Sequence, residues 1–136
     1  MYNRIVYWAV FILVFTLHNC EEIIMNLTAW STMYNLTLFD MNRALFITVA
    51  VLLTMASIIT AIVLEYRKSP TSLRVLRVFC WMMLFNALSH VALSIYSASY
   101  MPGVVTAVVL LIPVYCWLLL NSTEHRRNKW KRIKHS

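Results

Sequence analysis

The sequence has very little charge and almost no glycine. Charged residues make up 12% of the 136 residues, and only one residue is glycine. Soluble domains carry about 25% charged residues and about 7% glycine, so this chain is not an ordinary soluble domain. Hydrophobic residues make up 61% of the total, which indicates a protein with several membrane-spanning segments.

Four long apolar runs contain most of these hydrophobic residues. The first run, 6–25, is interrupted only by Thr16 and by a polar block from His18 to Glu22, and three further runs follow. Each approaches the roughly 20 helical residues that cross a hydrocarbon core of about 30 Å. Backbone groups in lipid must pair within a helix or a closed barrel, and the runs show no alternation of apolar and polar residues. We therefore predict an all-α membrane protein, a four-transmembrane-helix bundle forming a single domain over 1–136, with helices at about 5–25, 44–64, 74–98 and 103–120.

The connection over 26–42 is polar but carries aromatic residues at helical spacing. Trp30 and Tyr34 lie one helical turn apart, and such residues gather at the headgroup level of a membrane. An interfacial amphipathic segment is therefore expected between the first two helices. Pro113 falls inside the fourth run, where a proline kinks a helix or loosens one of its turns.

The positive charges fall almost entirely on one side of the predicted spans. Of the twelve Lys and Arg residues, all but Arg43 lie before the first span, around the connection between the second and third, or in the basic tail 121–136. The positive-inside rule then places both termini in the cytoplasm, and we expect an integral membrane protein. The tail suits anionic lipid headgroups, at about 1 kcal/mol per charge, although these charges can equally serve only to set topology. No nucleic-acid partner is expected.

The most unusual feature is an acidic pair inside the first apolar run. Glu21 and Glu22 follow His18 by three and four residues, which places them on related faces of a helix, with the two carboxylates splayed by about 100°. A carboxylate at membrane depth costs roughly 2.5 to 3.5 kcal/mol. The cluster therefore predicts a functional site within the membrane.

The third span carries a polar stripe that can meet this acidic block. Asn86, His90, Ser94 and Ser97 follow one another at spacings of four, four and three, which puts them on one helix face. At about 1.5 Å per residue from the inner membrane face, His18 and His90 come to a similar depth. We expect the two histidines to meet.

Two imidazoles with one or two carboxylates are a suitable ligand set for zinc or another divalent metal. One glutamate would bind the metal while the other acts as general base on a bound water. The candidate catalytic residues and metal ligands are His18, Glu21, Glu22 and His90, and the candidates for surrounding or substrate contacts are Asn86, Ser94 and Tyr100.

Other interpretations of these residues remain open. Histidines and glutamates in a span can be satisfied by structural hydrogen bonds, or can conduct protons or ions. The three cysteines are expected to act as small apolar residues, with Cys20 as an alternative ligand because it lies within the acidic block. Glu65 is followed closely by Arg67 and Lys68, so we expect it to form an ion pair at the inner end of the second span, outside the site.

Three motifs occur in order along the chain: His18-x-x-Glu21-Glu22, Asn86-x-x-x-His90 and Tyr100-x-Pro102-Gly103. In this combination, and over nearly its whole length, the chain resembles the HXXEE family of membrane proteins. The resemblance implies a functionally uncharacterised, mostly bacterial family that is suspected of enzymatic activity because of its His and Glu residues. It therefore also implies a protein of the bacterial cytoplasmic membrane. It supplies site candidates and no substrate. The polar stretch after the first motif and the basic tail depart from the family.

The favoured function is a metal-dependent membrane hydrolase or transferase whose amphiphilic, lipid-like substrate enters laterally near the outer leaflet. A small proton- or ion-coupled transporter is the first alternative. Four short helices enclose little path for transport unless the chain forms a homodimer, and the inner half of the first span offers no polar route. A non-catalytic partner of a larger membrane complex, with polar residues bonding between helices, is the second alternative.

Overall fold

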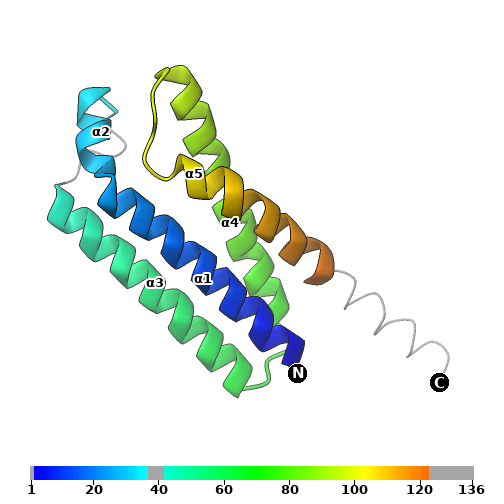
Figure 1. Cartoon of the computed structure of the whole chain (residues 1–136). Coiled ribbons are helices and arrows are strands. Elements are labelled where there is room, and N and C mark those ends of the chain that lie inside the picture. The colour runs from blue at the N-terminus through cyan, green and yellow to red at the C-terminus, as the bar shows by residue number, and fades with distance from the viewer. Residues whose placement is uncertain (1, 37–41, 123–136) are drawn as a thin grey trace, which may run out of the picture.

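Helices form the whole of the chain's regular structure where the computed structural model describes it, over residues 2–36 and 42–122. Three long helices, α1 (Tyr2–Ile24), α3 (Arg43–Tyr66) and α4 (Ser72–Tyr96), are followed by a fourth span, Val104–Ser122 (Figure 1). All four are long and apolar enough to cross a membrane. The predicted all-α fold with four spanning helices is therefore confirmed, while the predicted orientation stays a prediction.

The fourth span is not a uniform helix. It starts as α5 (Val104–Thr106), continues through a π-helical turn, η2 (Ala107–Leu111), and then runs as an α-helix to Ser122. Pro113 lies two residues after the end of this turn and has no N–H to donate to a carbonyl one turn earlier. The widened turn agrees with the loosening expected from this proline.

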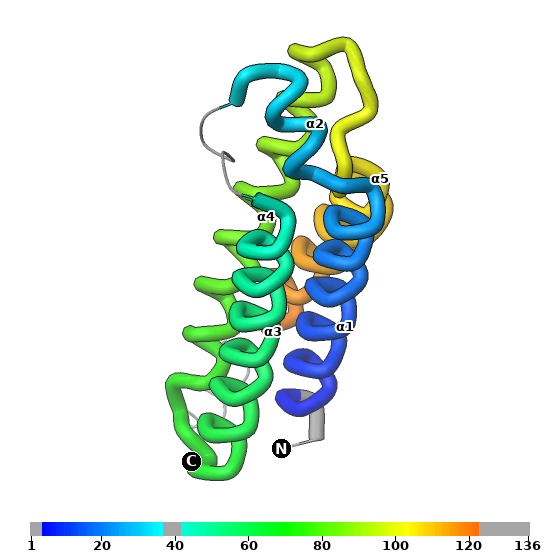
Figure 2. The backbone as a smooth tube through the Cα atoms, turned by 90° about the vertical axis from the view of Figure 1, so that its left-hand side faces the viewer, coloured from blue at the N-terminus to red at the C-terminus, as the bar shows by residue number. Residues whose placement is uncertain are grey.

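The short helix α2 (Leu27–Met33) follows α1 and lies beside the loop between α4 and α5 (Figure 2). Asn26 begins it, since its side chain accepts a hydrogen bond from the backbone N–H of Ala29. The indole of Trp30 donates to Ser99 Oγ over 3.1 Å, and Leu27 packs with Trp30 and Met101. This helix occupies the segment expected to be amphipathic, and the end of the bundle that carries it is called the α2 end below.

Helix α1 has the largest buried share of the four spans and packs against α3, α4 and η2. Its inward face is aromatic: Trp8 and Phe11 are almost fully buried, and the Phe11 ring stacks on Tyr115 with centroids 5.1 Å apart. The other helices expose large apolar side chains, as helices in contact with lipid do. Residues on α1 are therefore surrounded by protein more than residues on any other helix.

A partly buried ion pair lies at the end of the bundle opposite α2. Arg4 donates to Glu65 Oε1 over 3.0 and 3.2 Å, and Ser72 also donates to this carboxylate. The predicted ion pair of Glu65 is present, but its partner is Arg4 of α1, since Arg67 and Lys68 are exposed. The prediction named the wrong partners because the packing of α1 against the end of α3 cannot be read from the order of the residues.

The basic tail predicted over 121–136 lies outside the described residues from 123 onward.

Helix bounds differ from the predicted ones by a few residues. Helix α3 begins where the side chain of Asn42 accepts a hydrogen bond from Leu45 N over 2.8 Å. It ends before Lys68, whose φ is 49°, and Pro70 prevents its continuation.

Candidate metal and acid–base site

Three side chains from two helices converge near the α2 end. His18 and Glu22 lie one turn apart on α1, and His90 comes from α4. Glu22 Oε1 lies 3.3 Å from His18 Nε2 and 2.9 Å from His90 Nε2, and the two rings meet with centroids 4.9 Å apart. All three residues are buried. The expectation that the two histidines meet is thus confirmed.

Both imidazoles are held by their other ring nitrogen. His90 Nδ1 donates to the carbonyl oxygen of Pro102 over 2.9 Å, because a carbonyl can only accept. His18 Nδ1 lies 2.8 Å from Thr106 Oγ1, whose own hydrogen goes to the carbonyl of Gly103. Both rings therefore carry a proton on Nδ1 and direct Nε2 toward Glu22.

Asn86 supports this assignment for His18. Its side-chain N–H donates to His18 Nε2 over 3.0 Å, so that nitrogen accepts. The neutral form of each ring then places a lone pair on Nε2. Asn86 already supplies a hydrogen to His18 Nε2, whereas His90 Nε2 and an ionised Glu22 would be two acceptors 2.9 Å apart in a buried place. That pair requires a cation between them, either a proton or a metal ion.

The ligand atoms are spaced as a metal site needs. One atom each from His18, Glu22 and His90 lies within 4.8 Å of the others, and tetrahedral ligands about 2.0 to 2.1 Å from zinc are about 3.3 Å apart. Imidazoles whose second nitrogen donates to a carbonyl or hydroxyl are the usual form of histidine ligands. The donor set therefore fits a divalent metal such as zinc with only small shifts.

Gly103 allows the fourth span to approach both rings. A Cβ at this position would lie 2.7 Å from His90 Cε1 and 2.9 Å from His18 Cε1. The backbone there has φ of 93°, which L residues rarely adopt. The chain's single glycine thus stands where two histidine edges leave no room for a side chain.

The structure does not bring Glu21 to this cluster. Its carboxylate accepts from the Tyr100 hydroxyl, from Val105 N over 3.2 Å and from Thr106 N over 2.7 Å. Adjacent helical residues point about 100° apart, so Glu22 faces the histidines while Glu21 faces the start of the fourth span. The two glutamates have different surroundings and different partners.

The remaining candidates are placed as follows. Asn86 touches the cluster through His18, and Tyr100 is bonded to Glu21. Ser94 donates to the carbonyl of Ser99 over 2.6 Å and shapes the turn after α4. Cys20 is exposed and does not belong to the ligand cluster found among the described residues.

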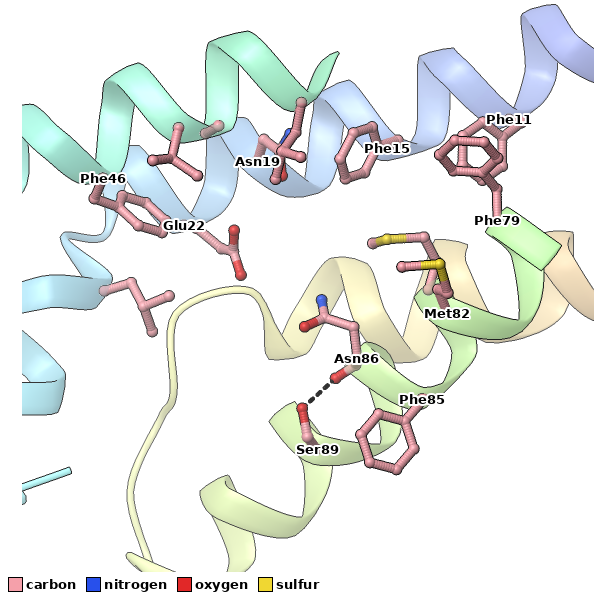
Figure 3. Close-up of a pocket in the computed structure, with 15 residues that line it drawn as sticks. Phe11, Phe15, Asn19, Glu22, Phe46, Phe79, Met82, Phe85, Asn86 and Ser89 are labelled. Carbon is pink, nitrogen blue, oxygen red and sulfur yellow. Dashed lines mark hydrogen bonds between the residues drawn. The ribbon is translucent and has the colours of Figure 1, made fainter. Parts of the chain in front are cut away.

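A largely apolar cavity of about 410 Å³ lies beside the cluster, between α1, α3 and α4. The carboxylate of Glu22 and the amide of Asn86 point toward it, and aromatic rings and methionine side chains line the rest (Figure 3). Its polar residues, Asn19, Glu22, Asn86 and Ser89, gather toward the α2 end, whereas Phe11 and Phe79 lie toward the opposite end. Phe46 lies beyond Glu22, and Phe85 lies beside Asn86 and Ser89 (Figure 3), so the polar groups form one patch in an otherwise apolar cavity.

Sequence reasoning missed three parts of the site. These are the Pro102 carbonyl, the hydroxyl of Thr106 and the contact of Gly103 with both rings. A backbone carbonyl leaves no signal in a sequence, and an isolated threonine in an apolar run is unremarkable. The single glycine, standing in the Tyr100-x-Pro102-Gly103 motif, was the available signal.

Comparison with protein families gives one match. The family described as "Protein of unknown function with HXXEE motif" matches residues 8–118, a range that includes the three converging side chains and the loop that holds the rings. Searches of curated proteins and of solved structures found no match. The resemblance expected from the motifs is confirmed, and the chain belongs to the HXXEE-motif family of unknown function.

Proposed function

We propose that this protein is a metal-dependent membrane hydrolase or transferase that acts on a lipid-like substrate. The proposed ligands of a divalent metal such as zinc are His18, Glu22 and His90. One observation carries the proposal: three buried acceptor atoms converge at 2.9 and 3.3 Å while both Nδ1 atoms are engaged elsewhere.

A metal held this way would leave a coordination position for water and lower the pKa of that water to about 7. The Glu22 carboxylate lines the cavity, and if one of its oxygens bound the metal, the other would be placed to act as general base on that water. Asn86 donates to the single lone pair of His18 Nε2, so a metal bound at that nitrogen would displace this hydrogen bond. The amide released in this way would be placed to orient a substrate carbonyl at the same wall of the cavity.

The cavity supports an amphiphilic substrate that arrives from the bilayer. Met82 and Phe85 on α4 line it and are 63% and 77% exposed, and Leu53 on α3 is 56% exposed. Exposed lining residues on two neighbouring helices indicate an opening toward lipid. A molecule with its polar group at Glu22 and its apolar chain beside Phe11 would match the polarity of the cavity.

A proton is the competing occupant of the cluster. The 2.9 Å separation of His90 Nε2 and Glu22 Oε1 is also that of a hydrogen bond, which favours proton exchange as the second candidate function. Residues 5–15 of α1 carry no ionisable side chain except Tyr7, so this cluster has no evident relay along α1 to the opposite end. Proton transport therefore has less support than metal-assisted chemistry.

The first experiment measures the metal content of detergent-purified protein carrying no histidine tag. The test variant is His18→Ala with His90→Ala, and the matched control is His125→Ala with His135→Ala, which removes the same number of imidazoles from the tail. We expect about one equivalent of metal in the parent and the control and almost none in the test variant. A folded parent without metal would overturn the metal-dependent assignment in favour of a shared proton.

A further inference from the structure

Glu21, in the last turn of α1, joins that helix to the start of the fourth span. Its carboxylate receives the N–H groups of Val105 and Thr106 and the hydroxyl of Tyr100. The first N–H groups of a helix have no partner within that helix, and a negative charge near them is favourable. One side chain of α1 thereby secures both ends of the segment 100–106.

This segment also carries the acceptors that orient the two imidazoles. Pro102 supplies the carbonyl for His90, and Thr106 supplies the hydroxyl for His18. Thr106 therefore binds the Glu21 carboxylate through its backbone and the His18 ring through its side chain. A shift of the segment would move both acceptors at once.

The fit between the segment and the rings is close. Gly103 stands between the two acceptors, with the space for a Cβ already occupied by both histidine edges. A change in the distance between this segment and α1 would therefore change its contact with both rings. The Glu21 carboxylate is the charged contact that fixes this distance from the α1 side.

We propose that Glu21 is a positioning residue that holds segment 100–106 so that His18 and His90 both keep a proton on Nδ1 and present Nε2 to Glu22. The two adjacent glutamates of the motif then have separate tasks. Glu22 belongs to the cation site, and Glu21 acts through the loop that orients the imidazoles. The inference does not depend on which cation occupies the site, because it concerns the opposite side of each ring.

A purely structural role for Glu21 makes a different prediction. If the carboxylate only stabilised the bundle, its loss would lower the melting temperature and leave the histidine rings as they are. The positioning role requires the protonation pattern of both rings to change in protein that is still folded. The test must therefore observe the rings directly.

The experiment uses the full chain in detergent, freed of metal and labelled with ¹⁵N-histidine. Tail histidines are removed by His125→Ala and His135→Ala in every sample, so that only the two buried rings are observed. We expect Nδ1-protonated rings in this background and a mixture of Nδ1- and Nε2-protonated rings in Glu21→Gln. The matched control, Glu65→Gln, removes another partly buried carboxylate that joins α1 to a later segment and should leave the ring signals unchanged.

Ring signals in Glu21→Gln that equal those of the background would overturn the proposal. If that variant does not fold, Tyr100→Phe removes one of the donors to the carboxylate and should shift the signals in the same direction to a smaller extent. Unchanged signals in a folded Tyr100→Phe would then count against the proposal.

Zinc affinity provides an independent readout. Loss of a group that orients metal ligands usually weakens binding by about 10- to 100-fold, and we expect that loss in Glu21→Gln and not in Glu65→Gln. If the parent binds no metal, the proposed function fails while the ¹⁵N measurement still decides the role of Glu21. If the parent binds metal and the Glu21→Gln rings are unchanged, only the positioning role fails.

Discussion

Oε1 of Glu22 lies within 3.3 Å of Nε2 of His18 and within 2.9 Å of Nε2 of His90. One carboxylate oxygen therefore serves two imidazoles that come from different helices. Because both rings already use Nδ1, neither can turn to another partner without breaking a second hydrogen bond. Glu22 is the centre of the cluster rather than one of several interchangeable carboxylates.

Replacing this carboxylate with an amide should separate metal binding from folding. In Glu22→Gln the amide N–H groups can donate to the histidine nitrogens, so we expect the melting temperature to be retained or raised. The negative charge needed by a metal is lost, and bound zinc should fall from about one equivalent to nearly none. Metal analysis checks the expected loss of zinc, and thermal unfolding of the same sample checks the expected melting temperature. Full metal occupancy in Glu22→Gln would contradict the assigned ligand set.

Gly103→Ala should damage the cluster although it adds a single methyl group. The new Cβ would meet His90 Cε1 at 2.7 Å, and a φ of 93° is strained for alanine. Strain and overpacking together should lower the free energy of unfolding by about 2 to 5 kcal/mol. Ala98→Gly is the matched control, since Ala98 also has a positive φ, 47°, and should become slightly more stable. Unfolding in detergent measures both.

The fold was predictable because lipid leaves few choices. Four apolar runs of sufficient length must be helices in a bilayer, and Pro70 and Gly103 mark two of the turns between them. The meeting of His18 with His90 followed from counting residues along two helices. Periodicity alone sufficed for these features.

The partners of individual groups were not predictable to the same extent. The sequence could not show which glutamate faces the histidines, because that depends on how α1 is rotated against α4. It also could not show that Arg4 reaches Glu65 across 61 positions of the chain. Helix rotation and packing depend on the shapes of many side chains together, and no local pattern records them.

The hydroxyl of Tyr100 should resist ionisation. Partial burial and the hydrogen bond to the Glu21 carboxylate raise the pKa of Tyr100 from 10 to about 12. The neutral hydroxyl is the form that the fold favours, so its contribution to stability should be complete below pH 10 and be lost as the pH rises toward 12. A phenolate absorbance titration, compared with Tyr100→Phe, isolates this group. The difference between the two titrations is the contribution of Tyr100. If that contribution titrates near pH 10, the hydrogen bond to Glu21 does not form.

Arg4→Ala should destabilise the end of the bundle opposite α2. It leaves the carboxylate of Glu65, whose side chain is only 12% exposed, without its positive partner. Breaking a buried ion pair from one side costs about 3 kcal/mol or more, which should appear in denaturant unfolding of the detergent-solubilised protein. Arg67→Ala removes an equal charge from an exposed position and should change stability little. Equal effects of the two variants would argue against the ion pair.

Filling the cavity should reduce binding of a chain-like amphiphile. Ala50 lines the cavity and is 6% exposed, so Ala50→Phe places a ring in the space proposed for the apolar chain. We expect at least several-fold weaker binding of a fluorescent fatty-acyl probe, with metal content unchanged. Leu52→Phe, at a position that is 62% exposed on the same helix, is the control. Unaltered probe binding in Ala50→Phe would place the substrate elsewhere.

The bonds around the HXXEE motif also set an order on biosynthesis. The partners of Glu21 are synthesised after it: Tyr100 lies 79 positions later and Thr106 85 positions later. His90, a partner of Glu22, is also synthesised later. Until the last span leaves the ribosome, the first one holds two carboxylates without these partners, at a cost of a few kcal/mol each in lipid. Stable insertion of the first helix is therefore completed by the last, and a nascent chain halted before Tyr100 carries two carboxylates that lack these partners.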